Sequence, residues 1–599
     1  MLCFRGGKTM VQVYTNHIGY DCADTKSAVF RRKAEENPVS FSILREDTEE
    51  KVFEGVLQEV GEVDNWKKGY FYTLRFDELR EKGTYYIEVN CDNGAVARSY
   101  PFRIAPNLLE TDTISAVGYF FQSMRRTGEY READKHLKPR FGLIDGEYDL
   151  HGGWHDATGD PGVHLSHLDD TIFFNPQQVP FSVCAFFRMH DLLEQSDYPY
   201  YTQLKRRLLE EGMYGAEFVM RMRTETGGFF QTICCENALE PVLEAHKLGA
   251  HLRKVTLRYG GRANIDLNDL RPIDYECGIR SGAGYAVAAL AAAARYNFPS
   301  EFTSEEYITA AKEAMKYLVE NNDYICNNGN GWNIVDFYCA LDAYVEIYKT
   351  TREYGYLVRA REMAEKLMNL YVAIDDNMGY MSADKTERPF FHACDAGMPV
   401  VNLLNYFEIE PEAERKAKVV DLCEKVMRYQ ISITEEVNNP FGYARQFVQD
   451  VEGNRKVQFF YPHNCESAGW WQGESARQGS LATAARALSY VTADEKLKAE
   501  MEKFADDQIN WILGLNPYDC CLLHGRGRNN ITYFYIGNRF DFFQVPGGVC
   551  NGITSGLEDE HGIEFVTEPR PDIHDNWRWA EQWIPHCSWY MYALCMKKR

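Results

Sequence analysis

The hydrophobic pattern of the chain changes near residue 105. Before it, short alternating or β-branched runs recur at roughly ten-residue spacing with Gly, Asn and Asp between them, which predicts β-strands. The predicted strands are VQVYTN (11–16), SAVFRR (27–32), VSFSILR (39–45), KVFEGVL (51–57), YFYTLRF (70–76), GTYYIEV (83–89) and ARSYPFRI (97–104). About seven such strands predict an immunoglobulin-like β-sandwich over residues 1–106.

After Leu108 the apolar residues repeat with a period near 3.6, which predicts helices. The segment RSGAGYAVAALAAAARY (280–296) is almost entirely small, so it must be packed closely on all sides, as in the inner ring of a double-layered barrel. Pro399 interrupts one of the predicted segments. About twelve helices are predicted, near 112–127, 180–195, 203–224, 279–296, 304–321, 333–350, 354–373, 390–406, 411–432, 474–491, 496–514 and 582–597.

Twelve helices in one region favour six helical hairpins closed into a toroid. The fold class we expect is therefore multidomain: the β-sandwich followed by an all-α (α/α)6 barrel over residues 107–599. Three predicted loops, 129–179, 225–278 and 515–581, are too long to be simple connections. Long loops in compact domains are usually functional, so we expect the chemistry there.

Composition and net charge limit the classes of molecule that this protein is expected to bind. The 599 residues are 45% hydrophobic and 26% charged, typical of a globular protein, and the net charge of -23 argues against nucleic acid. We expect no contact with a membrane, since no apolar window is long enough to span one. The start lacks the apolar core of a signal peptide, which predicts a cytoplasmic location. The oligomeric state is not readable from the sequence.

Cysteine and histidine patterns give no metal signature. The 17 cysteines are scattered, which favours reduced thiols that fill apolar space. The pairs Cys234/Cys235 and Cys520/Cys521 lack the two-residue gap of a zinc knuckle. We expect no catalytic metal and no required cofactor, and calcium stays open as a structural ion. The histidines considered for ligand spacing are His155, His167, His463, His524, His574 and His586.

Tryptophan and carboxylate residues gather in the predicted loops. Trp154 accompanies Asp156 and Asp160, while Glu581 lies among Trp577, Trp579 and Trp583. Indole rings stack on sugar rings, and acetal hydrolysis needs one carboxylate to activate water and one protonated acid to assist the leaving oxygen. Apolar neighbours should raise the pKa of Glu581. Each feature alone has a structural interpretation: tryptophans that anchor loops, a calcium-binding or turn-capping aspartate pair, and a solvated acid at a helix start.

Several motifs resemble glycoside hydrolase family 9. GGWHDATGD (152–160) resembles its GGW-x-DAGD motif, AEQWIPHCSW (580–589) resembles its NEVAIDWNA segment, and WILGLNPY (511–518) is similar to W-x-LG-x-NP. Segment 461–482 resembles the family's stretch before an inner helix, and segment 280–291 resembles its helix that usually begins with an Arg-Glu-Gly pattern. The start VYTNHIGYDCADTKSAVF (13–30) is similar to the immunoglobulin-like module that precedes many members.

The resemblance implies an (α/α)6 barrel that cleaves β-1,4 bonds with inversion. It implies that Asp160 is the general base, Asp156 its partner in holding water, and Glu581 the general acid, with about 6.5–9.5 Å between Glu581 and the aspartates. Thr158 is an extra residue in the aspartate motif, so either aspartate could be the base. The residues predicted to bind substrate are Trp154, His463, Trp470, Trp471, Tyr518, Arg526 and Trp577.

Other departures bear on the substrate. The family's Pro-His-His-Arg loop is replaced by HGRGRNNITYFY (524–535), in which His524, Arg526 and Arg528 are candidate substitutes. An open cleft for a long glucan is therefore in doubt, and a cytoplasmic enzyme would act on short oligosaccharides. We expect an exo-acting enzyme on cello-oligosaccharides.

Four alternatives stay open. The first is an exo-β-D-glucosaminidase on chitosan oligosaccharides, with Asp169 or Asp170 pairing the substrate ammonium. The second is a β-1,4-endoglucanase, that is, a cellulase. A non-catalytic sugar-binding protein would require loss of a key acid, and a polysaccharide lyase would need a Tyr or His base and a neutraliser for a uronic carboxylate.

Overall fold

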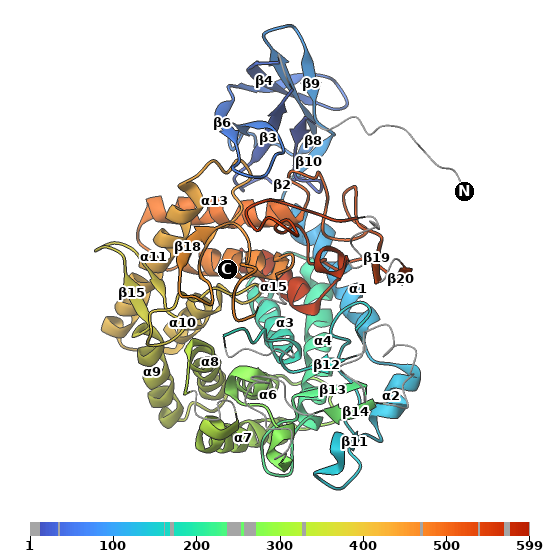
Figure 1. The fold of residues 1–599 in the computed structure, drawn as a ribbon, viewed down its shortest axis with the longest axis vertical. Helices are drawn as coiled ribbons and strands as arrows, with labels where there is room; N and C mark the ends of the chain where they lie inside the picture. Colours follow the sequence, from blue (N-terminus) through green and yellow to red (C-terminus); the bar gives the residue numbers. More distant parts are fainter. Residues whose placement is uncertain are drawn as a thin grey trace.

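The computed structural model has two parts, a β-sandwich and a larger helical domain (Figure 1). Within the described residues, no helix combines the length and apolar character needed to cross a membrane. Four residues considered above, Asp169, Asp170, Trp470 and His574, lie outside the described residues. The described ranges are 12–33, 36–160, 162–167, 173–235, 253–256, 271–325, 331–467, 471–536, 539–567 and 576–597.

The β-sandwich packs two sheets around an apolar core that includes Phe30, Phe41 and Ile87, all without exposed surface. One sheet has the order β1 (Val13–Tyr14), β3 (Ser27–Arg32), β7 (Tyr70–Arg75), β6 (Gln58–Glu62). The other has the order β2 (Tyr20–Asp21), β10 (Phe102–Ala105), β8 (Gly83–Cys91), β4 (Pro38–Arg45), β5 (Lys51–Gly55), with β9 (Val96–Arg98) paired to β8. Each predicted strand segment contains a strand, so the predicted sandwich is confirmed.

The helical domain is the predicted (α/α)6 barrel. Its inner helices contact one another in order around a ring, and the last contacts the first. They are α3 (Val179–Glu194), α6 (Gly284–Ala293), α8 (Ile334–Thr351), α10 (Met398–Ile409), α12 (Ser475–Ser489) and α15 (Ile584–Met596). The outer ring consists of α1 (Ser115–Met124), α4 (Tyr201–Arg221), α7 (Ser304–Ile325), α9 (Tyr354–Met368), α11 (Ala413–Glu435) and α13 (Glu495–Ile512) (Figure 1).

Two of the inner helices pack closely through small residues. Every residue of α6 is buried, as expected for a helix of small residues, and every residue of α12 is also buried. Gly479 of α12 faces α15 so closely that an added Cβ would lie 2.9 Å from the backbone of Trp589. The small residues of α12 therefore leave room for the bulky residues of α15, which are also buried.

One predicted helix begins later than expected. The segment 390–406 was predicted as a helix interrupted by Pro399, but α10 begins at Met398 and Pro399 lies in its first turn. The missing N–H of proline costs nothing there, because the first N–H groups of a helix have no intrahelical acceptor. Residues 390–397 form an irregular segment before the helix.

The two long loops of the first half join in one sheet. Its order is β11 (Lys138–Pro139), β14 (Arg253–Thr256), β13 (Thr232–Cys235), β12 (Val163–His164). Three hairpins follow, β15 (Tyr371–Ala373) with β16 (Gly379–Met381), β17 (Gln446–Gln449) with β18 (Arg455–Gln458), and β19 (Tyr533–Ile536) with β20 (Arg539–Phe543). Two short helices within the described ranges are α2 (Gly128–Asp134) and α14 (Trp577–Ala580).

The sandwich is packed firmly on the barrel. Trp66 is 2% exposed and its ring lies 4.8 Å from that of Phe459 and 6.1 Å from that of Trp511. At the other end of the chain, Lys597 binds Asp21 and Asp24. The sandwich therefore supports the barrel, and its one tryptophan belongs to this contact.

Replacing Trp66 with alanine should destabilise the whole chain by about 3–5 kcal/mol, because it empties a large buried volume between the two parts. The measurement is the urea midpoint, followed both by fluorescence and by residual activity. Val96→Ala, at a side chain that is 52% exposed, is the control and should change little. An unchanged midpoint in Trp66→Ala would contradict a supporting role of this contact.

Candidate active site

The GGWHDATGD segment turns sharply into the barrel. Gly152 and Gly153 have positive φ angles of 107° and 70°, and a Cβ on Gly153 would meet the ring of Phe218 at 2.9 Å. Glycine is required here because other residues adopt this backbone conformation only with strain. The turn sends the Trp154 side chain into the core and carries the chain on to Asp156.

The aspartate loop is joined to the segment that holds Glu581. Ala157 and Trp583 form an antiparallel β-bridge. Beside it, the N–H of Thr158 donates to the carbonyl of Gln582 at 2.9 Å, and the N–H of Gln582 donates to the Thr158 hydroxyl at 3.1 Å. Thr158, the residue added to the family motif, therefore takes part in holding the two segments together.

Asp156 is a buried carboxylate with fixed partners. Its Oδ1 accepts hydrogen bonds from Trp583 Nε1 at 2.9 Å and from Gln178 Nε2. Its Oδ2 lies 3.5 Å from His167 Nε2. Burial raises the pKa of Asp156 well above its usual range, and the charge of Asp160 raises it further.

Asp160 is more exposed than Asp156. Its Oδ1 accepts a hydrogen bond from the N–H of Gly162 at 2.6 Å, which fixes the carboxylate at the end of the loop. Its charge acts on both Asp156 and Glu581. The three predicted catalytic carboxyl groups therefore share one electrostatic neighbourhood, with Asp160 as the group that influences the other two.

Glu581 follows α14 and has a raised pKa. Burial and the charge of Asp160 raise the pKa of Glu581 to about 8, against the opposing effect of a hydrogen bond with the Asn551 side chain. The direction of this shift is the expected one, with burial as its largest cause. The indole N–H of Trp583 is directed to Asp156. A carboxyl group with this pKa is protonated at neutral pH.

Asn551 connects Glu581 to the barrel. Its N–H donates to the Glu581 carbonyl at 2.8 Å, and its side-chain amide donates to the Trp577 carbonyl at 2.7 Å. His586 Nδ1 accepts from the N–H of Ala476 at 2.7 Å, so its Nε2–H donates to Asn551 Oδ1, also at 2.7 Å. Inner helices α12 and α15 thereby fix the position of Glu581.

Comparison with known proteins identifies the family. Residues 8–93 match the cellulase N-terminal ig-like domain, and residues 112–536 match glycosyl hydrolase family 9. The chain belongs to glycoside hydrolase family 9. It is therefore a glycoside hydrolase. The family match ends before Glu581, so the role of this residue rests on the geometry described above. No curated protein matches the chain in sequence.

Solved structures agree with the family fold. A metagenome-derived family 9 endoglucanase shares 17% identity and a TM-score of 0.64, with 98% of this chain and 99% of that chain covered. A family 9 protein of Bacteroides ovatus shares 15% identity and a TM-score of 0.64, with 98% of both chains covered. The family 9 endoglucanase J30 shares 16% identity and a TM-score of 0.65, with 97% of this chain and 99% of that chain covered.

Three of the predicted sugar-binding residues of this family 9 chain gather around Arg578. The His463 and Trp471 rings lie 3.9 Å apart. The Arg578 guanidinium lies 4.3 Å from the centre of the Trp471 ring and 4.8 Å from that of Trp577. These half-buried rings form one stack, and one of its members, Trp577, lies four residues before Glu581 in the sequence. A tight stack of this kind is rigid, which suits a surface on which a sugar ring packs.

Three other predicted sugar-binding residues, Trp154, Tyr518 and Arg526, have different surroundings. Trp154 has no exposed surface and its indole donates to Glu211 at 3.1 Å, so the prediction that it contacts sugar is corrected: it packs in the core. The Tyr518 ring lies 3.8 Å from the ammonium of Lys68 in the sandwich. Arg526 is exposed and donates to the Asp112 carbonyl at 2.9 Å, beside the start of α1.

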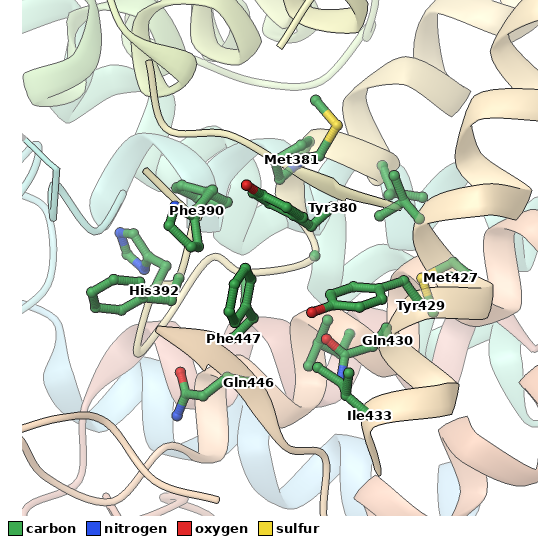
Figure 2. Close-up of a pocket in the computed structure, with 18 of the residues that line it drawn as sticks. Tyr380, Met381, Phe390, His392, Met427, Tyr429, Gln430, Ile433, Gln446 and Phe447 are labelled. Carbon is green, nitrogen blue, oxygen red and sulfur yellow. The ribbon is translucent and has the colours of Figure 1, made fainter. Parts of the chain in front are cut away.

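A small pocket lies in another part of the barrel, between α10, α11 and the hairpins β15–β16 and β17–β18 (Figure 2). Tyr380, Phe390, His392, Tyr429 and Phe447 line it. It encloses about 70 Å³, which is room for a few water molecules rather than a sugar. The irregular segment before α10 thus helps to line a pocket whose lining residues do not include the three carboxyl groups.

Sequence reasoning missed four residues that organise the site: His164, Gln178, Asn551 and Gln582. Only His164 had a local signal, because His164 and His167 are spaced H-x-x-H directly after the aspartate loop. The other three contact the carboxylates or their loops from other segments of the chain: Gln178 lies 22 residues from Asp156, and Gln582 lies 424 residues from Thr158. An amide side chain carries no pattern in a single sequence.

The position of Trp154 gives a direct test. Trp154→Phe should lower stability by about 1–3 kcal/mol, because Glu211 loses a buried hydrogen bond, and should leave KM within about twofold. Trp471→Phe is the matched control and should raise KM with little change in stability. Urea denaturation and initial rates measure both. A large KM effect confined to Trp154→Phe would return this residue to the cleft.

Proposed function

We propose that this family 9 hydrolase cleaves β-1,4-glycosidic bonds with inversion, using Asp160 as general base and Glu581 as general acid. The observation that carries the proposal is the different environment of the carboxyl groups. Glu581 has a pKa raised to about 8 and holds a proton to give, while Asp160 is the less buried of the two aspartates. Acetal hydrolysis with inversion needs a protonated acid and a second carboxyl group that activates water.

The environment of Asp156 supports its assignment as the partner of Asp160. One of its oxygens is occupied by Trp583 and Gln178, and burial disfavours its ionised form. A carboxyl group held in this way is a poor base but a good anchor for the attacking water, which it would orient toward Asp160. The bond that breaks is the glycosidic C–O bond: water adds to the anomeric carbon, Asp160 takes its proton, and Glu581 protonates the leaving oxygen.

We further propose exo action on short cello-oligosaccharides. The supporting observation is the sheet formed by β11, β14, β13 and β12, because β12 begins at Val163, directly after the aspartate loop. A sheet in this place would close one end of a cleft beside Asp160. Solved family 9 relatives are called endoglucanases, so cleavage within the chain is the alternative for the same chemistry.

The test of substrate and mode is a time course of products from cellopentaose and the chitosan pentamer, with the anomeric configuration followed by NMR. Stepwise release of α-glucose is the expected result. Release of glucosamine would indicate the alternative substrate, chitosan oligosaccharides. Fragments of several lengths would indicate cleavage within the chain, as by an endoglucanase. Release of the β-anomer would contradict inversion, whichever substrate is cleaved.

The acid assignment predicts a substrate-dependent loss. Glu581→Gln should lower kcat/KM about 10²–10⁴-fold on cello-oligosaccharides, whose leaving groups need protonation, and much less on a dinitrophenyl glycoside. Asp160→Asn should lower both by similar factors. In the unmodified enzyme kcat/KM should fall as pH rises through about 8, where Glu581 loses its proton. Glu558→Gln, at an exposed carboxylate, is the control. Equal losses on both substrates in Glu581→Gln would exclude it as the acid.

A further inference from the structure

A buried histidine faces the catalytic aspartates. His164 lies on β12, and its Nδ1 is bonded to the Thr232 hydroxyl on the neighbouring strand β13. This bond turns Nε2 toward the aspartate loop. A Cβ on Gly162 would meet His164 Nε2 at 2.3 Å and Asp160 Oδ1 at 2.9 Å, so both atoms border the same small space.

His164, Asp156 and Asp160 together form a compact set of ligand atoms. One atom from each residue lies within 4.8 Å of the other two. A cation equidistant from three such atoms would be at most about 2.8 Å from each, so movements under about 1 Å would give the about 2.0–2.2 Å bonds of zinc with imidazole and carboxylate.

The surroundings resemble a metal site beyond the first ligands. Thr232 fixes the second nitrogen of the His164 ring, and Trp583 with Gln178 fixes one oxygen of Asp156. Such outer partners orient metal ligands and raise affinity. His167 Nε2, 3.5 Å from Asp156 Oδ2, adds a second imidazole beside the set. A ligand set of one or two imidazole nitrogens together with carboxylate oxygens suits Zn²⁺, Co²⁺ or Ni²⁺ better than Ca²⁺ or Mg²⁺.

We propose that Asp156, Asp160 and His164 bind a divalent transition-metal cation of the zinc class, and that this cation inhibits the enzyme. The inhibition rests on the proposed function, because the cation would occupy the place of the attacking water and coordinate the base. Binding of the cation to the three residues does not depend on the proposed function. Two close carboxylates repel each other, and a cation between them relieves that repulsion.

Binding is measured first, on the full chain freed of metal by EDTA and desalting. Titration with Co²⁺ should give one equivalent with visible d–d absorption, and His164→Phe should weaken this binding at least tenfold. Asp156→Asn should weaken it as well, which covers the case in which His164→Phe fails to fold. His136→Gln is the matched control, because His136 also lies beside a carboxylate, Glu147, but on the surface. This variant should bind Co²⁺ as tightly as the unmodified chain.

Inhibition is measured next with Zn²⁺, each variant relative to its own metal-free rate. Zn²⁺ should inhibit the unmodified enzyme, EDTA should restore it, and the inhibition constant should rise at least tenfold in His164→Phe. The site would be overturned if His164→Phe and Asp156→Asn both bound Co²⁺ as tightly as the unmodified chain. Intense near-ultraviolet bands of cobalt–thiolate bonds would also overturn it. Site-dependent binding without inhibition, or with activation, would overturn the inhibitory role. If Asp160→Asn kept full activity while Co²⁺ binding needed His164, the proposed function would fail and the metal site would stand.

Discussion

The β-bridge between Ala157 and Trp583 is the contact on which the site depends. It joins a loop that precedes inner helix α3 to the segment that opens inner helix α15, and α15 packs against α3 to close the ring. The closure of the barrel and the assembly of the carboxylates are therefore one event. Thr158 strengthens this junction through its two hydrogen bonds with Gln582, so the added residue lengthens the loop without loosening it.

Burial acts in the same direction on two of the three carboxyl groups. It disfavours the ionised form of Asp156, and together with the charge of Asp160 it keeps the proton on Glu581 at neutral pH. Asp160 is less buried than Asp156. The crowding of the three groups makes additional negative charge costly, and a cation held between them would offset that cost.

The sequence predicted the fold well because the signals were periodic. Alternating runs gave the strands, and the small residues of α6 gave an inner helix, since a helix without bulky or polar residues has to be enclosed. The start of α10 was wrong because residues 390–397 are apolar without being helical, a distinction that hydrophobicity alone does not make. In the site, the carboxylates stood out through their motifs. Trp154 was misplaced because tryptophan serves both cores and sugar clefts, and Asn551 was missed because its role exists only in three dimensions.

The distance along the chain between the aspartate loop and Glu581 has a consequence for biosynthesis. When a ribosome has made the sandwich and most of the barrel, the aspartates have been synthesised but neither Glu581 nor the helix that closes the ring exists. A chain that terminates before Glu581 therefore lacks one of the three carboxyl groups as well as α15. Such a chain has no means of assembling the site.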